Sequence, residues 1–109
     1  MAHGSRIERG RLILSLEGEV DLSESPRVRE LLLDGVRRKI DVVVDLSRVT
    51  YIDSSGVASL IEAFQTSRGA GTRFALACAS EAVLRVLRLA RLDRVFVIHP
   101  TLEDGFDAE

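Results

Sequence analysis

The sequence is poor in the residues that stabilise small folds by cross-linking. A single cysteine among 109 residues excludes an internal disulfide framework and is compatible with a reducing compartment. No apolar run approaches the roughly 20 residues that a membrane helix needs, and the N-terminal MAHGSRIERG lacks the hydrophobic core of a signal peptide. We therefore expect a cytoplasmic protein without direct membrane insertion. The surroundings of Cys78, FALACAS, predict a buried and inert thiol.

An excess of charge of one sign is also missing. The formal net charge is -2, so no overall field would attract DNA or RNA, and we expect no nucleic-acid partner. The chain is 46% apolar and 29% charged, which is ordinary for a globular protein of one domain. We expect this single domain to span residues 1–109, with residues 1–5, MAHGS, forming a disordered tail or a cloning remnant.

Strand and helix patterns alternate along the first half of the chain. RLILSLEGEVD predicts a strand, with a short edge strand over residues 6–9 before it. The next helix has start signals, because Ser25 suits the N-cap and Pro26 suits the first helical position. The β-branched run IDVVVDLS predicts a buried strand that ends near Asp45, whose side chain would cap a turn.

The second half continues this alternation. A helix follows RVTYID, with its apolar stripe beginning at Val57 and its end at Gly69 and Gly71. TRFALACA predicts a strand, SEAVLRVLRLA a helix capped by Ser80, RVFVIH a last strand, and the C-terminal residues a short closing helix. We therefore predict an α/β fold, with a mostly parallel mixed sheet of four to five strands and about four flanking helices.

The stretch TYIDSSGV lies where a strand passes into a helix. Functional groups in parallel sheets collect at the C-terminal ends of strands, and both Asp21 and the motif DSSG belong to that edge. A serine at a helix N-terminus is usually a cap. Asp53 could itself be the cap, however, and a phosphoryl group on a serine here would face free backbone N–H groups. The residues alone leave both interpretations open.

No catalytic motif accompanies these serines. The two histidines, His3 and His99, lie near the chain ends, and the G-x-S-x-G elbow, the Walker lysine and G-x-G-x-x-G are absent. A phospho-accepting role for Asp53 would require a lysine near the last strand, which instead ends in VIHP. We therefore expect no enzymatic activity, no cofactor and no metal site.

A resemblance to a known family covers nearly the whole chain. Its residues are LEGEVDLSESPRVRELLL, VVVDLSRVTYIDSSGVASLIEAF and GTRFALACASEAVLRVLRLARLDRVFVI. In this order they resemble the STAS domain of bacterial anti-sigma-factor antagonists, whose signature is a strand, DLS, and then DSSG opening a helix. The resemblance implies that an anti-sigma serine kinase of the GHKL type phosphorylates Ser54. It also implies that the unphosphorylated chain binds this kinase and frees a sigma factor, and that a PP2C-type phosphatase reverses the phosphorylation.

The resemblance also implies roles for the residues around Ser54. The neighbours expected at the switch site are Asp21, Asp53, Ser55 and Gly56, and the expected partner contacts are Leu22, Ser23, Val57 and Ala58. STAS domains serve elsewhere as small subunits of lipid-transport ABC complexes that dock on the ATPase. That role is the alternative to the antagonist, because two partner surfaces of different kinds can share one fold.

Overall fold

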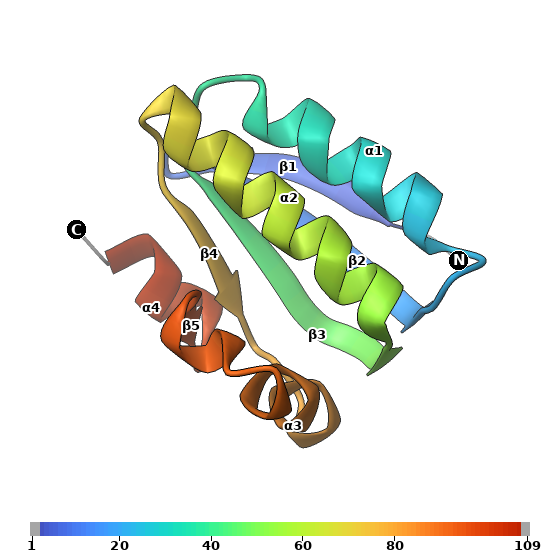
Figure 1. The fold of residues 1–109 in the computed structure, drawn as a ribbon. Helices are drawn as coiled ribbons and strands as arrows, with labels where there is room; N and C mark the ends of the chain where they lie inside the picture. Colours follow the sequence, from blue (N-terminus) through green and yellow to red (C-terminus); the bar gives the residue numbers. More distant parts are fainter. Residues whose placement is uncertain (1–2, 108–109) are drawn as a thin grey trace.

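A mixed sheet of five strands, in the order β1-β2-β3-β4-β5, forms the centre of the domain (Figure 1). The computed structural model describes residues 3–107. β1 pairs with β2 antiparallel, and the other neighbours pair in parallel. The elements are β1 (Gly4–Glu8), β2 (Arg11–Val20), α1 (Ser25–Val36), β3 (Val42–Ile52), α2 (Ser54–Ala70), β4 (Phe74–Ala77), α3 (Glu81–Leu89), the 3-10 turn η1 (Leu92–Arg94), β5 (Val97–His99) and α4 (Leu102–Asp107). The predicted α/β architecture is confirmed.

The helices cover the two faces of the sheet unequally. Side chains alternate between the faces of a strand, and Leu12 and Leu14 lie in the main core with residues of α1, α2 and α3. Ile13, between them, lies in a smaller cluster with Phe106 of α4. Figure 1 shows α1 and α2 side by side in front of the sheet. Three helices therefore share one face, and α4 covers the other.

The N-terminal residues are more ordered than the sequence suggested. The predicted edge strand is confirmed, but it begins at Gly4, and the His3 side chain is hydrogen-bonded, so the expected tail over residues 1–5 is wrong for residues 3–5. The turn between β1 and β2 consists of Arg9 and Gly10, both at positive φ (52° and 79°), as a tight hairpin requires. Pairing across this turn extends back to Gly4 and holds a polar segment that has no apolar pattern of its own. The rest of the expected tail, residues 1–2, lies outside the described residues.

β3 is one continuous strand where the sequence suggested two, one ending near Asp45 and one ending before Asp53. The strand does not end near Asp45 but continues to Ile52, and the Asp45 carboxylate accepts a hydrogen bond from the Ser47 N–H (3.0 Å) within it. β4 pairs with β3 only as far as Asp45, whereas β2 accompanies β3 to its end through two register shifts. The continuity was missed because the polar residues after Asp45 interrupt the apolar pattern, and only β2 pairs with this part of β3. As a result, β2 and β3 end together beyond the rest of the sheet.

Most helix boundaries follow the predicted signals, although Gly69 lies inside α2 rather than at its end. Gly71 ends α2 at φ 76°, and the Ser80 hydroxyl accepts the Val83 N–H at the start of α3. Ser25 is not the N-cap of α1 but its first residue, and it is buried, while Glu24 takes the cap position. Cys78 is partly buried, and desolvation raises the pKa of its thiol, which favours the unreactive protonated form.

Candidate functional site

The junction between β3 and α2 is built around the Asp53 carboxylate. Its Oδ1 accepts hydrogen bonds from the Ser55 N–H (2.9 Å), the Ser55 hydroxyl (2.6 Å) and the Gly56 N–H (3.2 Å). The bond from the Ser55 hydroxyl is the main cause that lowers the pKa of Asp53, and the backbone N–H groups add to it. Asp53 is therefore an ionised cap, and the cap function belongs to it rather than to either serine.

The two serines of the motif differ in environment. Ser55 is partly buried, and its hydroxyl is bound to Asp53. Ser54 is exposed as the first residue of the 17-residue helix α2, and among residues 3–107 no group hydrogen-bonds to its hydroxyl. At this position the positive end of the helix dipole favours an anion. The structure thus leaves one of the two hydroxyls accessible at the helix start.

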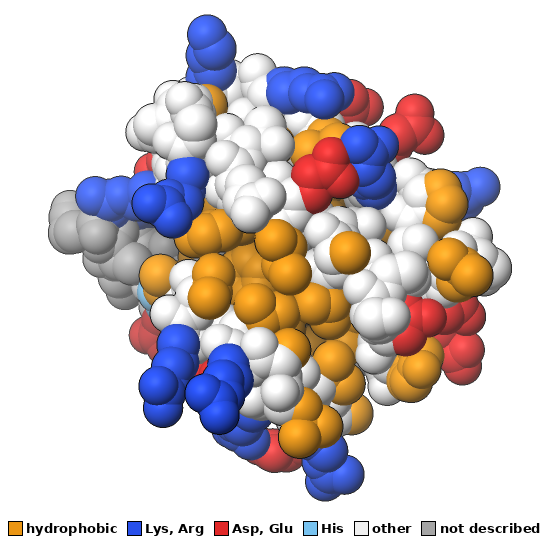
Figure 2. All heavy atoms as spheres, viewed as in Figure 1, with side chains coloured by type: hydrophobic (Ala, Val, Ile, Leu, Met, Phe, Trp, Pro, Cys, Tyr) orange, Lys and Arg blue, Asp and Glu red, His pale blue; other side chains and the backbone are white. Residues whose placement is uncertain are grey.

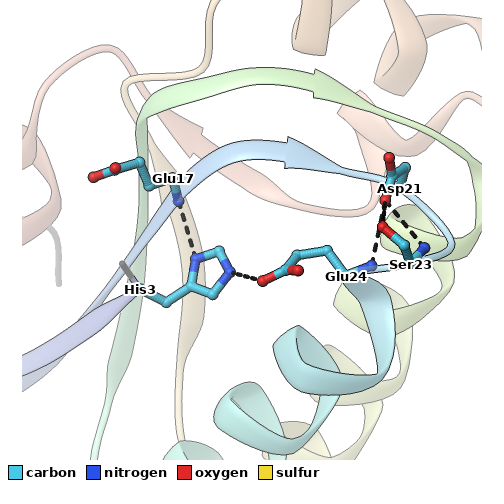
Figure 3. A network of polar contacts seen from close by, with 5 residues as sticks. All are labelled: His3, Glu17, Asp21, Ser23 and Glu24. Carbon is cyan, nitrogen blue, oxygen red and sulfur yellow. Dashed lines mark hydrogen bonds and ion pairs between the residues drawn. The ribbon is translucent and has the colours of Figure 1, made fainter. Parts of the chain in front are cut away.

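The loop between β2 and α1 has the same construction. The Asp21 Oδ1 accepts hydrogen bonds from the Ser23 N–H (3.0 Å), the Ser23 hydroxyl (2.7 Å) and the Glu24 N–H (3.3 Å), as Figure 3 shows. Between Asp21 and Ser23, Leu22 is 73% exposed. A large apolar side chain with this exposure, in a loop fixed by three hydrogen bonds, is suited to contact with another protein.

These two loops lie against each other. The Asp53 N–H donates to the Val20 carbonyl (3.2 Å), and the Leu22 backbone is among the causes that lower the pKa of Asp53. A Cβ atom added to Gly56 would come within 2.8 Å of the Val20 side chain, the Val20 carbonyl oxygen and the Ile52 side chain. Gly56 is therefore required for close packing between the start of α2 and the end of β2. The contact brings Asp21 and Leu22 to the same edge of the molecule as Ser54.

A further network ties the β2–α1 loop to the start of β1 (Figure 3). His3 Nδ1 accepts the Glu17 N–H (3.1 Å), and Nε2 lies 2.9 Å from the Glu24 carboxylate. Because Nδ1 is an acceptor here, Nε2 carries the proton of the neutral ring and donates to Glu24. Sequence reasoning missed this contact, because no local pattern connects residues 3 and 24.

The partner contacts predicted from the resemblance are not all accessible. Leu22, Ser23 and Ala58 are exposed, but Val57 is only 7% exposed and belongs to the core. Its inclusion as a contact is wrong, because it starts the apolar stripe that fixes α2 to the sheet. Tyr51, 49% exposed on β3, was missed as a surface residue because strand alternation breaks down there.

A groove of about 560 Å³ between α1 and α2 continues from this site. Ser55 and Ala58 line it on one helix and Pro26 on the other. Arg29 of α1 spans the groove and forms a two-pronged ion pair with Glu62 of α2, with both N–O distances 2.6 Å. This contact lowers the pKa of Glu62. The exposed surface formed by the two loops is thus continuous with this groove between α1 and α2.

Comparison with known proteins places this fold and site. The STAS domain profile matches residues 5–105, and the chain therefore belongs to the STAS domain family. It is 26% identical over 92 residues to the anti-sigma-B factor antagonist of Bacillus subtilis, with 84% of each chain covered. It is 29% identical over 82 residues to the anti-sigma-B factor antagonist of Listeria monocytogenes, covering 74% of this chain and 72% of the relative.

A solved structure agrees with these relatives. The crystal structure of an anti-sigma factor antagonist from Mycobacterium paratuberculosis superposes with a TM-score of 0.88 at 27% identity, covering 94% of this chain and 88% of that one. Within residues 3–107, no helix combines the length and the apolar character that crossing a membrane requires. The relatives named here are anti-sigma factor antagonists.

Proposed function

We propose that this protein is an anti-sigma-factor antagonist whose partner binding is switched by phosphorylation of Ser54. In its unphosphorylated form it binds an anti-sigma serine kinase of the GHKL type through the edge formed by the β2–α1 loop and the start of α2. Phosphorylation ends this binding, and a PP2C-type phosphatase restores it. The observation that carries the proposal is the exposed Ser54 hydroxyl, which has no hydrogen-bond partner within residues 3–107, beside the exposed Leu22.

The two serines support Ser54, rather than Ser55, as the phosphoacceptor. A kinase must reach the hydroxyl and bring it to the γ-phosphate of ATP. Phosphate on Ser55 would displace the 2.6 Å hydrogen bond to Asp53 and place a dianion against an ionised carboxylate. Phosphate on Ser54 would displace no hydrogen bond of the described structure, and the helix dipole would favour it.

The switch acts through surface charge and leaves the fold intact. A phosphoserine adds about two negative charges at pH 7. Asp53 and Asp21 already hold negative charge at this edge, so a partner that docks here would have to desolvate or oppose the added dianion. Helix α2 is held by core side chains, among them Leu60 at 0% exposure, that lie away from the modified position.

In vitro phosphorylation tests the acceptor. Incubation with the cognate kinase and ATP, followed by peptide mass spectrometry, should locate phosphate on Ser54. Ser54→Ala should abolish the modification and Ser55→Ala should retain it. Phosphate on Ser55 with Ser54 unmodified would contradict the proposal.

A capture experiment from the source cell tests the class of partner. Wild-type and Ser54→Asp baits are compared, and the proteins retained only by the wild type are identified. Recovery of a GHKL-type kinase that Ser54→Asp loses supports the antagonist. Recovery of an ABC ATPase instead would favour the lipid-transport alternative. The antagonist is proposed first because the relatives described above carry that name.

A further inference from the structure

A second binding site lies away from Ser54, beside the C-terminal half of α2. The cavity has a volume of about 330 Å³, which falls within the range of small-ligand sites. Ser67 and Arg68 line it from α2, Thr72 from the connection before β4, Phe74 from β4, and Val97 from β5. Arg68 is 14 residues further along α2 than Ser54, about 20 Å at the rise of an α-helix, so the two sites are separate.

The wall of the cavity is apolar and aromatic. Phe64 and Phe74 line it, and their rings pack edge to face with centroids 6.4 Å apart. Val97 is 55% exposed, although it belongs to a strand, because β5 is the outermost strand on this side of the sheet. Figure 2 shows hydrophobic side chains gathered in a hollow of the face that bears α1 and α2, with positively charged side chains at several places around it. An apolar body of a ligand would therefore remove exposed apolar surface from water.

The rim of the cavity is positively charged, in contrast with the chain as a whole. Three arginines (Arg11, Arg68 and Arg73) and one aspartate (Asp41) line it, whereas the net charge of the protein is -2. The guanidinium of Arg68 lies 5.8 Å from the centre of the Phe64 ring. Neither the Arg68 nor the Arg73 side chain forms an ion pair within residues 3–107. Asp41 accepts a hydrogen bond from the Arg73 backbone N–H (2.9 Å), and the three arginines of the lining leave an excess of positive charge over this one carboxylate.

We propose that this cavity binds a small organic carboxylate with an apolar body, held by Arg68 and Arg73 at the rim and by the phenylalanine wall beneath. Guanidinium groups form paired hydrogen bonds with carboxylates, which fixes the orientation of the ligand, and the wall receives the hydrocarbon part. The site is independent of the phospho-switch, since none of its lining residues belongs to the edge that contains Ser54.

Decanoate is the probe, titrated below its micellar concentration into the full chain labelled with nitrogen-15. The amide signals of residues 72–75 and of Val97 should shift and saturate. Decanol, which has the same chain length without the charge, should bind about tenfold more weakly, because the charged hydrogen bonds are lost. Shifts confined to another region, no saturable shift, or equal binding of decanol would overturn the proposal.

Charge-neutral variants make the test specific. Arg68→Gln combined with Arg73→Gln should lower the affinity for decanoate about tenfold or more. Val97→Ser should also weaken binding, because it removes part of the apolar wall. Arg85→Gln, an exposed arginine of α3 outside the lining, is the matched control and should leave the affinity unchanged. Circular dichroism verifies that each variant is folded. Unchanged affinity in the double arginine variant would refute the assigned carboxylate site.

Discussion

The loop after β2 and the junction after β3 are two copies of one local structure. In each, an aspartate accepts hydrogen bonds from the backbone and hydroxyl of the serine two positions later, and from the next N–H. The residue between them is directed outward: Leu22 in the first copy and Ser54 in the second. The part that the two copies share is the hydrogen-bonded aspartate and serine, here called the carboxylate frame. The part that differs is the side chain between them. The same carboxylate frame presents an apolar contact in one loop and a modifiable hydroxyl in the other.

A third D-x-S sequence shows that the motif alone is not enough. Asp45 accepts the Ser47 N–H (3.0 Å), but Leu46 between them is 0% exposed, because this copy lies inside β3. The end of a strand, and not the motif, makes the middle residue accessible. The two exposed copies also differ at the fourth position, where Glu24 reaches His3 and Gly56 packs against Val20.

The largest effect is expected from charge in the second copy. Ser54→Asp should lower the affinity for the partner kinase by about 100-fold or more, because a desolvated like charge at an interface costs several kcal/mol. Its melting temperature should stay near that of the wild type, since the frame around Asp53 does not involve the Ser54 hydroxyl. Calorimetric titration and a circular-dichroism melt measure the two quantities.

Ser54→Asn is the matched control, because it has similar size without the charge and should retain most of the affinity. A large fall in melting temperature of Ser54→Asp would mean that the helix start unfolds, and the charge mechanism would then be wrong.

The second effect concerns the fourth position of the frame. Gly56→Ala should destabilise the fold by about 1–3 kcal/mol, because its Cβ would lie 2.8 Å from a backbone oxygen and two side chains. Gly69→Ala, in the same helix with nothing within 4 Å of the added carbon, should instead stabilise by about 0.4–1 kcal/mol. Urea unfolding of both variants measures the contrast, and equal effects would contradict the packing argument.

The third effect concerns Leu22, the outward side chain of the first copy. Leu22→Ala should weaken kinase binding by about tenfold, within the range for an exposed apolar contact that becomes buried. Stability should be unchanged, because Leu22 is 73% exposed in the free protein. Titration of the variant against the kinase measures it. Full retention of affinity would remove the β2–α1 loop from the interface.

The smallest expected effect is on the pKa of Asp53, and it distinguishes Ser55 from Ser54. Ser55→Ala should raise the pKa of Asp53 towards its ordinary value, because the Ser55 hydroxyl is the main cause of the lowering. Carbon-13 NMR titration of the Asp53 carboxyl measures this shift, and Ser54→Ala should leave it unchanged.

The free energy of unfolding should depend on pH through the same shift in the pKa of Asp53. Because the pKa of Asp53 is lower in the folded than in the unfolded chain, the ionised group stabilises the fold at pH values above the unfolded pKa, about 3.9. This stabilisation is lost as the pH falls through the folded pKa. Wild type and Ser55→Ala should therefore differ in stability near neutral pH and converge in acid. A constant difference at all pH values would assign the Ser55 contribution to packing instead.

Much of the fold follows from local signals in the sequence. Ser80 and Gly71 mark a helix start and a helix end, and both are confirmed, because a cap is formed by neighbours in the chain. The errors have longer-range causes. Asp45 looks like a strand end in the sequence, but pairing with β2 continues the strand beyond it. Ser25 looks like a helix cap, but the packing of α1 buries it as the first residue of the helix.

The candidate site was predictable in part for the same reason. The motif around Ser54 is contiguous, so the sequence and its family resemblance identify it. The hydrogen bond that distinguishes Ser55 from Ser54 requires coordinates. So do the contact of Gly56 with Val20 and the network of His3, which join residues 36 and 21 positions apart, respectively.

The strand order has a consequence for the shape of the docking edge. In doubly wound sheets, ligand crevices form where the strand order reverses and neighbouring crossovers leave towards opposite faces. Here β2, β3, β4 and β5 follow one another in sequence order, and α1, α2 and α3 share one face. No two of these crossovers diverge, so the strand order itself opens no crevice between their loops. A partner would therefore meet Leu22 and Ser54 as exposed side chains of two adjacent loops.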